Sequence, residues 1–178
     1  MPTVFVVGGP AGTGKTTTGT MLAFKLHCPY IEGDSLHPKA NIEKMSEGIP
    51  LTDDDRWGWL KRLSEIASKK ASEDSTGCAV VSCSMLKRSY RKYIKECSSC
   101  PCSFRFIFLY TSYEELIKRV SHRHGHYMKS DMVKSQYDIM EIPSNKELIA
   151  NGGDAVAVNA TNQLPEEVFE DVLGLLDL

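Results

Sequence analysis

The stretch that decides the fold is Val4-Phe5-Val6-Val7-Gly8-Gly9-Pro10-Ala11-Gly12-Thr13-Gly14-Lys15-Thr16. Its first four residues form a short apolar run rich in β-branched side chains, which predicts a buried strand. The residues from Gly9 to Thr16 match the pattern G-x-x-x-x-G-K-[ST] in full. Helical spacing of apolar residues over 15–26 predicts a helix directly after this pattern. A strand, a glycine-rich turn and a helix in this order predict a phosphate-binding loop.

Each part of this loop has a physical task. Glycines let the backbone turn tightly and bring several N–H groups close to phosphate oxygens, and the following helix presents its positive end to the same anion. Lys15 is expected to reach the β- and γ-phosphates, and the Thr16 hydroxyl to bind Mg²⁺. We therefore predict ATP and Mg²⁺ as ligands. The predicted nucleotide-binding residues of the loop are Gly9, Pro10, Ala11, Gly12, Thr13, Gly14, Lys15, Thr16 and Thr17.

Strand and helix patterns alternate along the rest of the chain. Further short apolar runs predict strands over 29–32, 78–83, 104–110 and 155–158. Helices are predicted over 35–47, from 53 until the polar run 68–76, and over 86–95, 113–122, 132–140 and 165–176, with Thr52 as a hydroxyl cap and Asp53–Asp55 as first-turn acids. This alternation predicts an α/β fold with a five-stranded parallel sheet flanked by helices. The 178 residues are expected to form a single domain.

Composition excludes several classes of function. With 42% hydrophobic and 25% charged residues, the chain has the composition of a soluble globular protein. No apolar run approaches the roughly 20 residues that span a bilayer. A net charge of −2 argues against general electrostatic binding to nucleic acid or to an anionic membrane. The six cysteines are too few for a disulfide scaffold, and we expect a cytoplasmic protein with reduced thiols.

Other classes that use a phosphate loop fit the sequence less well. Asp55-Arg56-Trp57-Gly58 matches the D-x-x-G of regulatory GTPases but lies inside a predicted helix, and Asn145-Lys146-Glu147-Leu148 lacks the final acid of a guanine-selecting N-K-x-D. A large ATPase would need a hydrophobic strand that ends in Asp, whereas the run over 78–83 ends in Ser and Cys. A small-molecule kinase fits better, because it needs a second pocket for an acceptor hydroxyl, a base near it and cations over the phosphates.

The segment after the second predicted strand supplies such a pocket, and it resembles the gluconokinase family. The family pattern GD-x-x-HP-x-x-NI-x-KM-x-x-G-x-PL-x-DDDR-x-x-WL is reproduced nearly throughout residues 33–60. Residues 83–91 are similar to the family's CSALK-x-x-YR, with Met85 in place of Ala, and residues 119–127 resemble its R-x-x-R-x-GHFF lid segment. Gln136 and Glu141-Ile142-Pro143 resemble the stretch that follows. Glu32 departs from the family, since some relatives have Asp there.

The resemblance implies a P-loop kinase fold with a mobile lid over about 123–131 and an acceptor-binding segment over about 34–60. It implies phosphorylation of D-gluconate to 6-phospho-D-gluconate, which feeds the pentose phosphate pathway, and a homodimer. A kinase of another sugar or polyol acid, such as a shikimate-like acceptor, and a catalytically silent nucleotide-binding regulator remain as alternatives.

Candidate acceptor residues follow from the resemblance together with position and charge. Asp34 comes at the carboxyl end of a strand that we expect adjacent to the phosphate loop, where open parallel sheets bind ligands. It would orient or deprotonate the acceptor hydroxyl, or else cap the next helix. His37 would bind a sugar hydroxyl or cap the turn before Pro38. A gluconate carboxylate needs a cation, for which Arg56 and then Lys87 are the candidates, although either could be a solvated charge. The other predicted acceptor residues are Asn41, Lys44 and His126.

Two arginines of the lid segment are assigned to the nucleotide. Arg119 is expected to bind the nucleotide and Arg123 to neutralise the phosphates during transfer, so that Lys15, Asp34 and Arg123 form the predicted catalytic set. The three cysteines 97, 100 and 102 and the alternating histidines 122, 124 and 126 have a metal-like spacing. A structural zinc site wants four ligands, so we interpret these groups as surface thiols and lid residues.

Overall fold

The computed structural model describes residues 1–122 and 130–178. Strands and helices alternate along the chain, as the sequence pattern predicts. The strands are β1 (Thr3–Gly8), β2 (Tyr30–Glu32), β3 (Cys78–Ser82), β4 (Ser103–Tyr110) and β5 (Ala155–Asn159). The α-helices are α1 (Lys15–Leu26), α2 (Lys39–Ser46), α3 (Asp53–Glu73), α4 (Arg88–Glu96), α5 (Tyr113–Ser121), α6 (Ser130–Ile139) and α7 (Pro165–Leu176), and the 3₁₀ turns are η1 (Gly33–Leu36), η2 (Asn145–Glu147) and η3 (Ile149–Asn151).

All five strands run parallel in the order β2-β3-β1-β4-β5, which confirms the predicted sheet. Val4 of β1 pairs in register with Ala79 of β3 on one side and with Phe104 of β4 on the other. β2 does not pair with the loop strand β1, because β3 lies between them. The three residues of β2 pair on one side only, as a short edge strand does, whereas β3, which is apolar up to Val81, takes the interior position.

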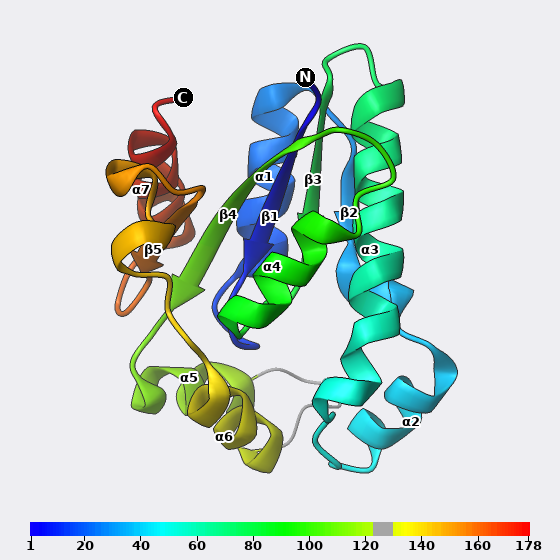
Figure 1. The fold of residues 1–178 in the computed structure, drawn as a ribbon. Helices are drawn as coiled ribbons and strands as arrows, with labels where there is room; N and C mark the ends of the chain where they lie inside the picture. The colour runs from blue at the N-terminus through cyan, green and yellow to red at the C-terminus, as the bar shows by residue number, and fades with distance from the viewer. Residues whose placement is uncertain (123–129) are drawn as a thin grey trace.

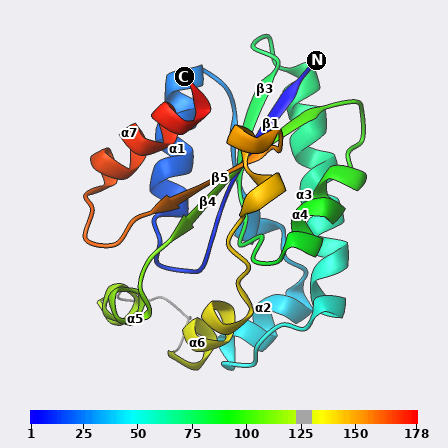
Figure 2. The same ribbon diagram turned by 60° about the vertical axis from the view of Figure 1, so that its left-hand side comes forward.

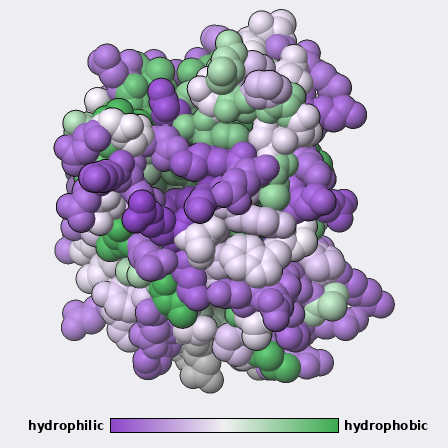
Figure 3. Space-filling model, viewed as in Figure 1, coloured by the Kyte–Doolittle hydropathy of each residue, from purple (hydrophilic) through white to green (hydrophobic). Residues whose placement is uncertain are grey.

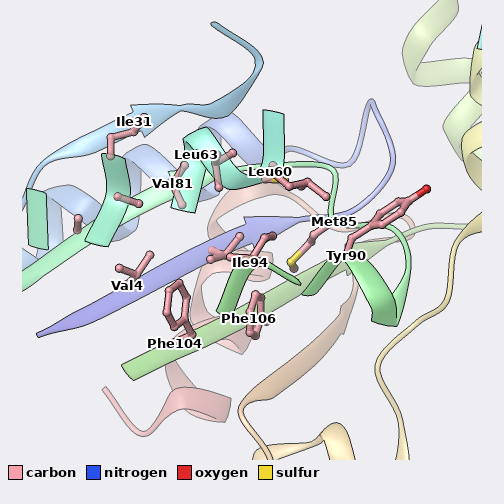
Figure 4. Packing of buried hydrophobic residues seen from close by; sticks show 14 of the residues in the cluster. Val4, Ile31, Leu60, Leu63, Val81, Met85, Tyr90, Ile94, Phe104 and Phe106 are labelled. Carbon is pink, nitrogen blue, oxygen red and sulfur yellow. The ribbon is translucent and has the colours of Figure 1, made fainter. Parts of the chain in front are cut away.

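Helices cover both faces of the sheet (Figures 1 and 2). On one face α3 and α4 bury Leu60, Leu63 and Ile94 against side chains such as Val4 and Phe106 (Figure 4). On the other face α1 and α7 pack through Leu22 and Val172 on the opposite sides of the same strands. The short helices α2, α5 and α6 gather beyond the carboxyl ends of the strands in Figure 1. The functional cavity described below opens at this edge.

The segment predicted as one helix over 35–47 is instead a 3₁₀ turn followed by α2. Its break falls at His37, whose backbone is extended with φ −63° and ψ 139° because the ring of Pro38 disfavours the helical conformation for the preceding residue. The following helix, α3, begins as predicted with a capping box between Thr52 and Asp55. It continues to Glu73, further than expected, because Ala67 and Ala71 extend its buried stripe into the polar run.

Hydrophilic residues predominate on the face shown in Figure 3, with smaller hydrophobic patches between them. In the part of the chain that the structure describes, no helix has both the length and the apolar character that a membrane crossing requires.

Candidate functional site

The predicted phosphate loop joins β1 to α1 and is held open by glycines at positions that other residues would not tolerate. Gly9 has a φ of 129°, and a Cβ there would lie 2.0 Å from the carbonyl oxygen of Leu109. Gly14 has a φ of 90° and faces open space, with nothing within 4 Å of where its Cβ would be. The Thr13 hydroxyl donates to the carbonyl of Pro10 at 2.7 Å and braces the loop from within. The glycine conformations and this internal hydrogen bond together give the backbone the tight curvature that a phosphate-binding loop needs.

A cavity of about 340 Å³ adjoins the loop. It brings together three of the predicted acceptor residues, Asp34, His37 and Arg56, with five loop residues, Ala11, Gly12, Gly14, Lys15 and Thr16. Residues from other elements complete the lining: Glu32, Met45, Leu51, Trp59, Ser84, Met132 and Gln136. The first helix, the turn after β2, and the helices α3 and α6 thus converge on one site.

Asp34 lies in η1, directly after β2, and its side chain is exposed. It lines the cavity together with Lys15, although the strands that precede these two residues, β2 and β1, are separated by β3. A carboxylate at this edge of the cavity can accept a proton or a hydrogen bond from a hydroxyl bound there.

His37 is 7% exposed and stacks on the indole of Trp59, with ring centroids 3.8 Å apart and an interplanar angle of 20°. The indole Nε1 donates to the carbonyl of Gly33 at 2.9 Å, which anchors the stack. Burial lowers the pKa of His37 to about 4; the nearby charge of Asp34 raises it, while Arg56 and Lys15 lower it further. The imidazole is therefore neutral at physiological pH.

Arg56 is 5% exposed and lines the cavity from the first turns of α3. One of its amino groups donates to the Tyr90 hydroxyl at 2.6 Å and lies 4.0 Å from Asp53. The Tyr90 hydroxyl in turn donates to Asp53, and burial is the main cause that raises the pKa of Tyr90 to about 12. These contacts use one amino group of the buried guanidinium and fix its orientation. Its other N–H groups can bind an anionic group.

Three other predicted acceptor residues do not line the cavity. The ammonium of Lys44 bonds the Asp55 carboxylate at 2.8 Å, and this hydrogen bond is the main cause that lowers the pKa of Asp55 to about 2. Lys87 lies 3.2 Å from Asp53. Asn41 is buried and donates to the backbone carbonyl of Asp55 at 2.8 Å. Their direct contact with an acceptor stays a prediction.

Thr16 meets a carboxylate that the sequence analysis did not assign to the site. Its hydroxyl donates to Glu32 at 2.8 Å, and Ser82 and Tyr30 also donate to Glu32, at 2.8 and 2.9 Å. Because Thr16 uses its proton here, its lone pairs stay available to a cation. A hydroxyl beside a carboxylate is the hard oxygen donor set that Mg²⁺ prefers, so these residues fit the ion. The position of Glu32 at the carboxyl end of a strand was the signal for it.

Arg119 lies at the end of α5 against the other side of the loop. It donates to Glu115 at 3.0 Å, to the Gly12 carbonyl at 3.3 Å and to the Ala160 carbonyl at 2.8 Å. A second cavity of about 260 Å³ lies beside it, lined by Thr13, Gly14, Thr17, Thr18, Arg119, Gln163, Pro165 and Val168. The side-chain oxygen of Gln163 is buried and has no hydrogen-bond partner among the described residues. Sequence reasoning missed Gln163, which had no motif to mark it.

Sequence reasoning also missed the roles of two residues quoted for other reasons. The side chain of Gln136, on α6, accepts from the backbone N–H of Ala11 at 2.8 Å and so ties α6 to the loop. Trp59, expected as part of a core stripe, also lines the cavity. The predicted lid over 123–131, with Arg123 and His126, falls largely on residues 123–129, which lie outside the described residues.

The D-x-x-G match and the groups with metal-like spacing can also be placed in the fold. Asp55-Arg56-Trp57-Gly58 lies inside α3. The sulfur atoms of Cys100 and Cys102 are 3.9 Å apart, and all six cysteines are free thiols. Within 1–122 and 130–178, no group of three or more His, Cys, Asp or Glu residues is arranged to hold a metal ion.

The all-parallel sheet, the glycine loop at its first strand and the adjoining cavity with a carboxylate and a buried arginine define a small-molecule kinase of the P-loop class. The family model described as shikimate kinase matches residues 11–177. The "Probable gluconokinase" of Schizosaccharomyces pombe is 48% identical over 174 residues, which cover 97% of this chain and 87% of that protein. The "Thermosensitive gluconokinase" of Escherichia coli is 39% identical over 143 residues, covering 80% and 74% of the two chains.

Comparison with solved structures supports the same fold. A gluconokinase from Sinorhizobium meliloti superposes with a TM-score of 0.81 at 41% identity, covering 99% of this chain and 92% of that one. The APS kinase of Mycobacterium tuberculosis, at 17% identity and a TM-score of 0.68 over 99% and 98% of the chains, shares the fold. The chain therefore belongs to the shikimate kinase family as that model defines it, and within it to the gluconokinase family.

Proposed function

We propose that this protein transfers the γ-phosphoryl group of ATP to the 6-hydroxyl of D-gluconate, forming 6-phospho-D-gluconate for the pentose phosphate pathway. The observation that carries the proposal is the cavity of about 340 Å³ in which Lys15 and Thr16 of the loop face the same space as Asp34, His37 and Arg56. A nucleotide site and a polar acceptor site share one enclosure. The relatives named gluconokinase, at 39–48% identity over most of the chain, supply the identity of the acceptor.

The residues on the two sides of the cavity have different roles in the phosphoryl transfer. The loop N–H groups and Lys15 hold the triphosphate, and the Asp34 carboxylate takes the proton as the acceptor oxygen bonds to the γ-phosphorus and the bond to ADP breaks. Arg56 binds the sugar-acid carboxylate. Mg²⁺, held by Thr16 with Glu32 beside it, would neutralise phosphate charge. The lid arginine Arg123, with His126, would close over the reactants and exclude water, which otherwise competes as acceptor.

The base of the nucleotide is assigned to the second cavity. Its lining includes Arg119 and Thr17, both predicted from sequence to bind the nucleotide. The unpartnered side-chain oxygen of Gln163 can accept a hydrogen bond from an amino group such as that of adenine. A single kinase domain acting as a homodimer in the cytoplasm completes the proposal, the dimer resting on the family resemblance and the compartment on six free thiols.

An ADP-release screen across gluconate, shikimate and other sugar acids tests this function. Shikimate belongs in the screen because the matching family model carries that name. We expect release with gluconate at a rate far above that with no acceptor, and none from a Lys15→Met variant. Release only with shikimate would replace the acceptor, and ATP binding without release for any acid would leave a nucleotide-binding regulator.

A further inference from the structure

The side-chain amide of Asn41 is held between two groups, one of which fixes its orientation. Asn41 is 3% exposed, and its amide nitrogen donates to the backbone carbonyl of Asp55 at 2.8 Å. A backbone carbonyl can only accept, so the NH₂ end of the amide must face it. The same nitrogen lies 3.2 Å from Nδ1 of His37. Its second hydrogen is therefore available to Nδ1, and Nδ1 must be the acceptor.

A neutral imidazole that accepts at Nδ1 carries its proton on Nε2. No described residue bonds Nε2, and it is absent from the fully buried atoms that lack a partner. Since the ring is 7% exposed and lines the cavity, this atom keeps its access through the cavity. Stacking on Trp59 holds the plane of the ring, and a ring flip would place a carbon against the Asn41 amide.

We propose that Asn41 is a positioning residue that holds His37 as its neutral Nε2–H tautomer, so that the cavity presents an uncharged donor to an acceptor oxygen of the sugar acid. The proposal rests on the proposed function for the identity of the ligand. It differs from the direct contact that the sequence suggested for Asn41, because this residue does not line the cavity. His37 is then the residue that touches the substrate, and Asn41 acts through it.

The charges around His37 agree with an uncharged donor. Asp34 from η1, Arg56 from α3 and Lys15 at the start of α1 face it, and burial with the two cations outweighs the carboxylate, which lowers the pKa to about 4. A protonated ring would also direct an Nδ1–H at the NH₂ of Asn41, donor against donor. An oxygen bound at Nε2 is therefore recognised as a hydrogen-bond acceptor, not as a counter-ion, and its recognition does not change between pH 6 and 8.

Long-range ¹H–¹⁵N NMR of the imidazoles in the unliganded full chain tests the tautomer without any turnover. His37 is assigned by the signals that vanish in His37→Gln. We expect the Nε2–H pattern, unchanged from pH 5.5 to 8. An Nδ1–H pattern, or a ring that titrates near its ordinary pKa, would overturn the proposal. This result is independent of whether gluconate is the acceptor, so its failure and that of the proposed function are distinguishable.

Asn41→Asp tests the positioning. The nearly isosteric carboxylate presents an acceptor to Nδ1, so the proton should move to Nδ1 and the pKa of His37 should rise into the observable range. We expect KM for gluconate to increase about tenfold or more, through the loss of one hydrogen bond, while KM for ATP stays unchanged. Asn151→Asp is the matched control, since the Asn151 amide also donates to a backbone carbonyl, at 2.8 Å, on an exposed turn.

Substitutions of His37 itself distinguish a hydrogen-bond donor from a side chain that only fills space. His37→Gln places an NH₂ near the position of Nε2 and should keep a KM for gluconate within a few-fold of wild type, whereas His37→Leu keeps the bulk without the donor and should raise it. Equal KM values for the Gln and Leu variants, or an Asn41→Asp variant with the wild-type tautomer and the wild-type KM, would refute the assignment.

Discussion

Asp34 carries the chemical step in this proposal, and its removal gives the first prediction. Asp34→Asn keeps the shape of the turn but cannot take a proton, so we expect kcat with gluconate to fall by roughly 10²-fold or more with little change in KM for ATP. Steady-state ADP release measures both constants. Asp171→Asn, on the exposed face of α7, is the control. Near-normal turnover of Asp34→Asn would remove Asp34 from the role of base.

His37 makes stability depend on pH. Its folded pKa of about 4 lies below the value of 6.5 for an unfolded histidine, so the unfolded chain binds more protons between these values. The free energy of unfolding is therefore fully retained above about pH 6.5 and falls as the pH drops toward 4. We expect this one group to cost about 2 kcal/mol between pH 7 and pH 5. Urea unfolding at both pH values measures the loss, which should be absent in His37→Gln; a loss of equal size in that variant would contradict the assignment.

Among the elements, two glycines with opposite surroundings give a matched pair. Gly58 lies inside α3, exposed, with nothing within 4 Å of its would-be Cβ. Gly33 begins the turn after β2, where a Cβ would lie 1.8 Å from the carbonyl oxygen of Ser82. We expect Gly58→Ala to raise the free energy of unfolding by about 1 kcal/mol, and Gly33→Ala to lower it by about 2 kcal/mol or more. Urea denaturation of the two variants checks both signs, and the same sign for both would show that this local geometry is wrong.

The elements also show where sequence reasoning succeeds. The phosphate loop, the α3 cap and the helices over 15–26 and 165–176 were predicted from contiguous residues, because turns, caps and helical stripes depend on near neighbours. The order of the strands was not predictable in this way. Whether β3 or β2 lies beside β1 depends on packing between segments some 50 residues or more apart in sequence, and a short apolar run carries no record of its partner.

The candidate site also contains residues that local motifs mark and residues that only the fold brings together. Lys15, Thr16 and Asp34 occupy motif positions, so the sequence marked them. Glu32 had a signal in its place at the end of a strand, but its bond with Thr16 depends on the fold. Gln136 enters the site through a contact that no local pattern encodes, since it meets Ala11 across 125 residues of chain. Lys44 and Lys87 illustrate the opposite case, since their charges suggested an anionic ligand but meet the carboxylates of Asp55 and Asp53 in the fold.

At the scale of the whole molecule, Arg91 ties distant segments together. Its guanidinium, 2% exposed, donates to the carbonyl of Met85, to the carbonyl of Glu141 and to both carboxylate oxygens of Glu147. It thereby joins α4 to the chain after β3 and to the chain between α6 and β5. This ion pair joins a buried arginine to a half-buried glutamate, and it holds the connection that follows α6, the helix that lines the cavity through Met132 and Gln136.

Breaking this pair should destabilise the entire fold. Arg91→Met leaves the Glu147 carboxylate and the carbonyls of Met85 and Glu141 without their buried donor, and we expect a loss of about 3–5 kcal/mol. Arg88→Met is the matched control, because Arg88 is 72% exposed and lies 3.9 Å from the same carboxylate; its loss should stay within about 1 kcal/mol. Thermal and urea unfolding decide, and similar losses for the two variants would show that burial does not determine the strength of this interaction.

The strand between the two halves of the site has a consequence of its own. Neighbouring strands are about 4.8 Å apart, so β3 sets the ends of β1 and β2 at about 10 Å from each other. In the proposed function, the triphosphate binds beyond the end of β1 and the sugar acid beyond the end of β2, so the backbone of the sheet sets the distance between the two ligands. Any change in acceptor length must therefore be accommodated by the turn after β2 and by α2, where a family of such enzymes can vary its substrate without disturbing the sheet.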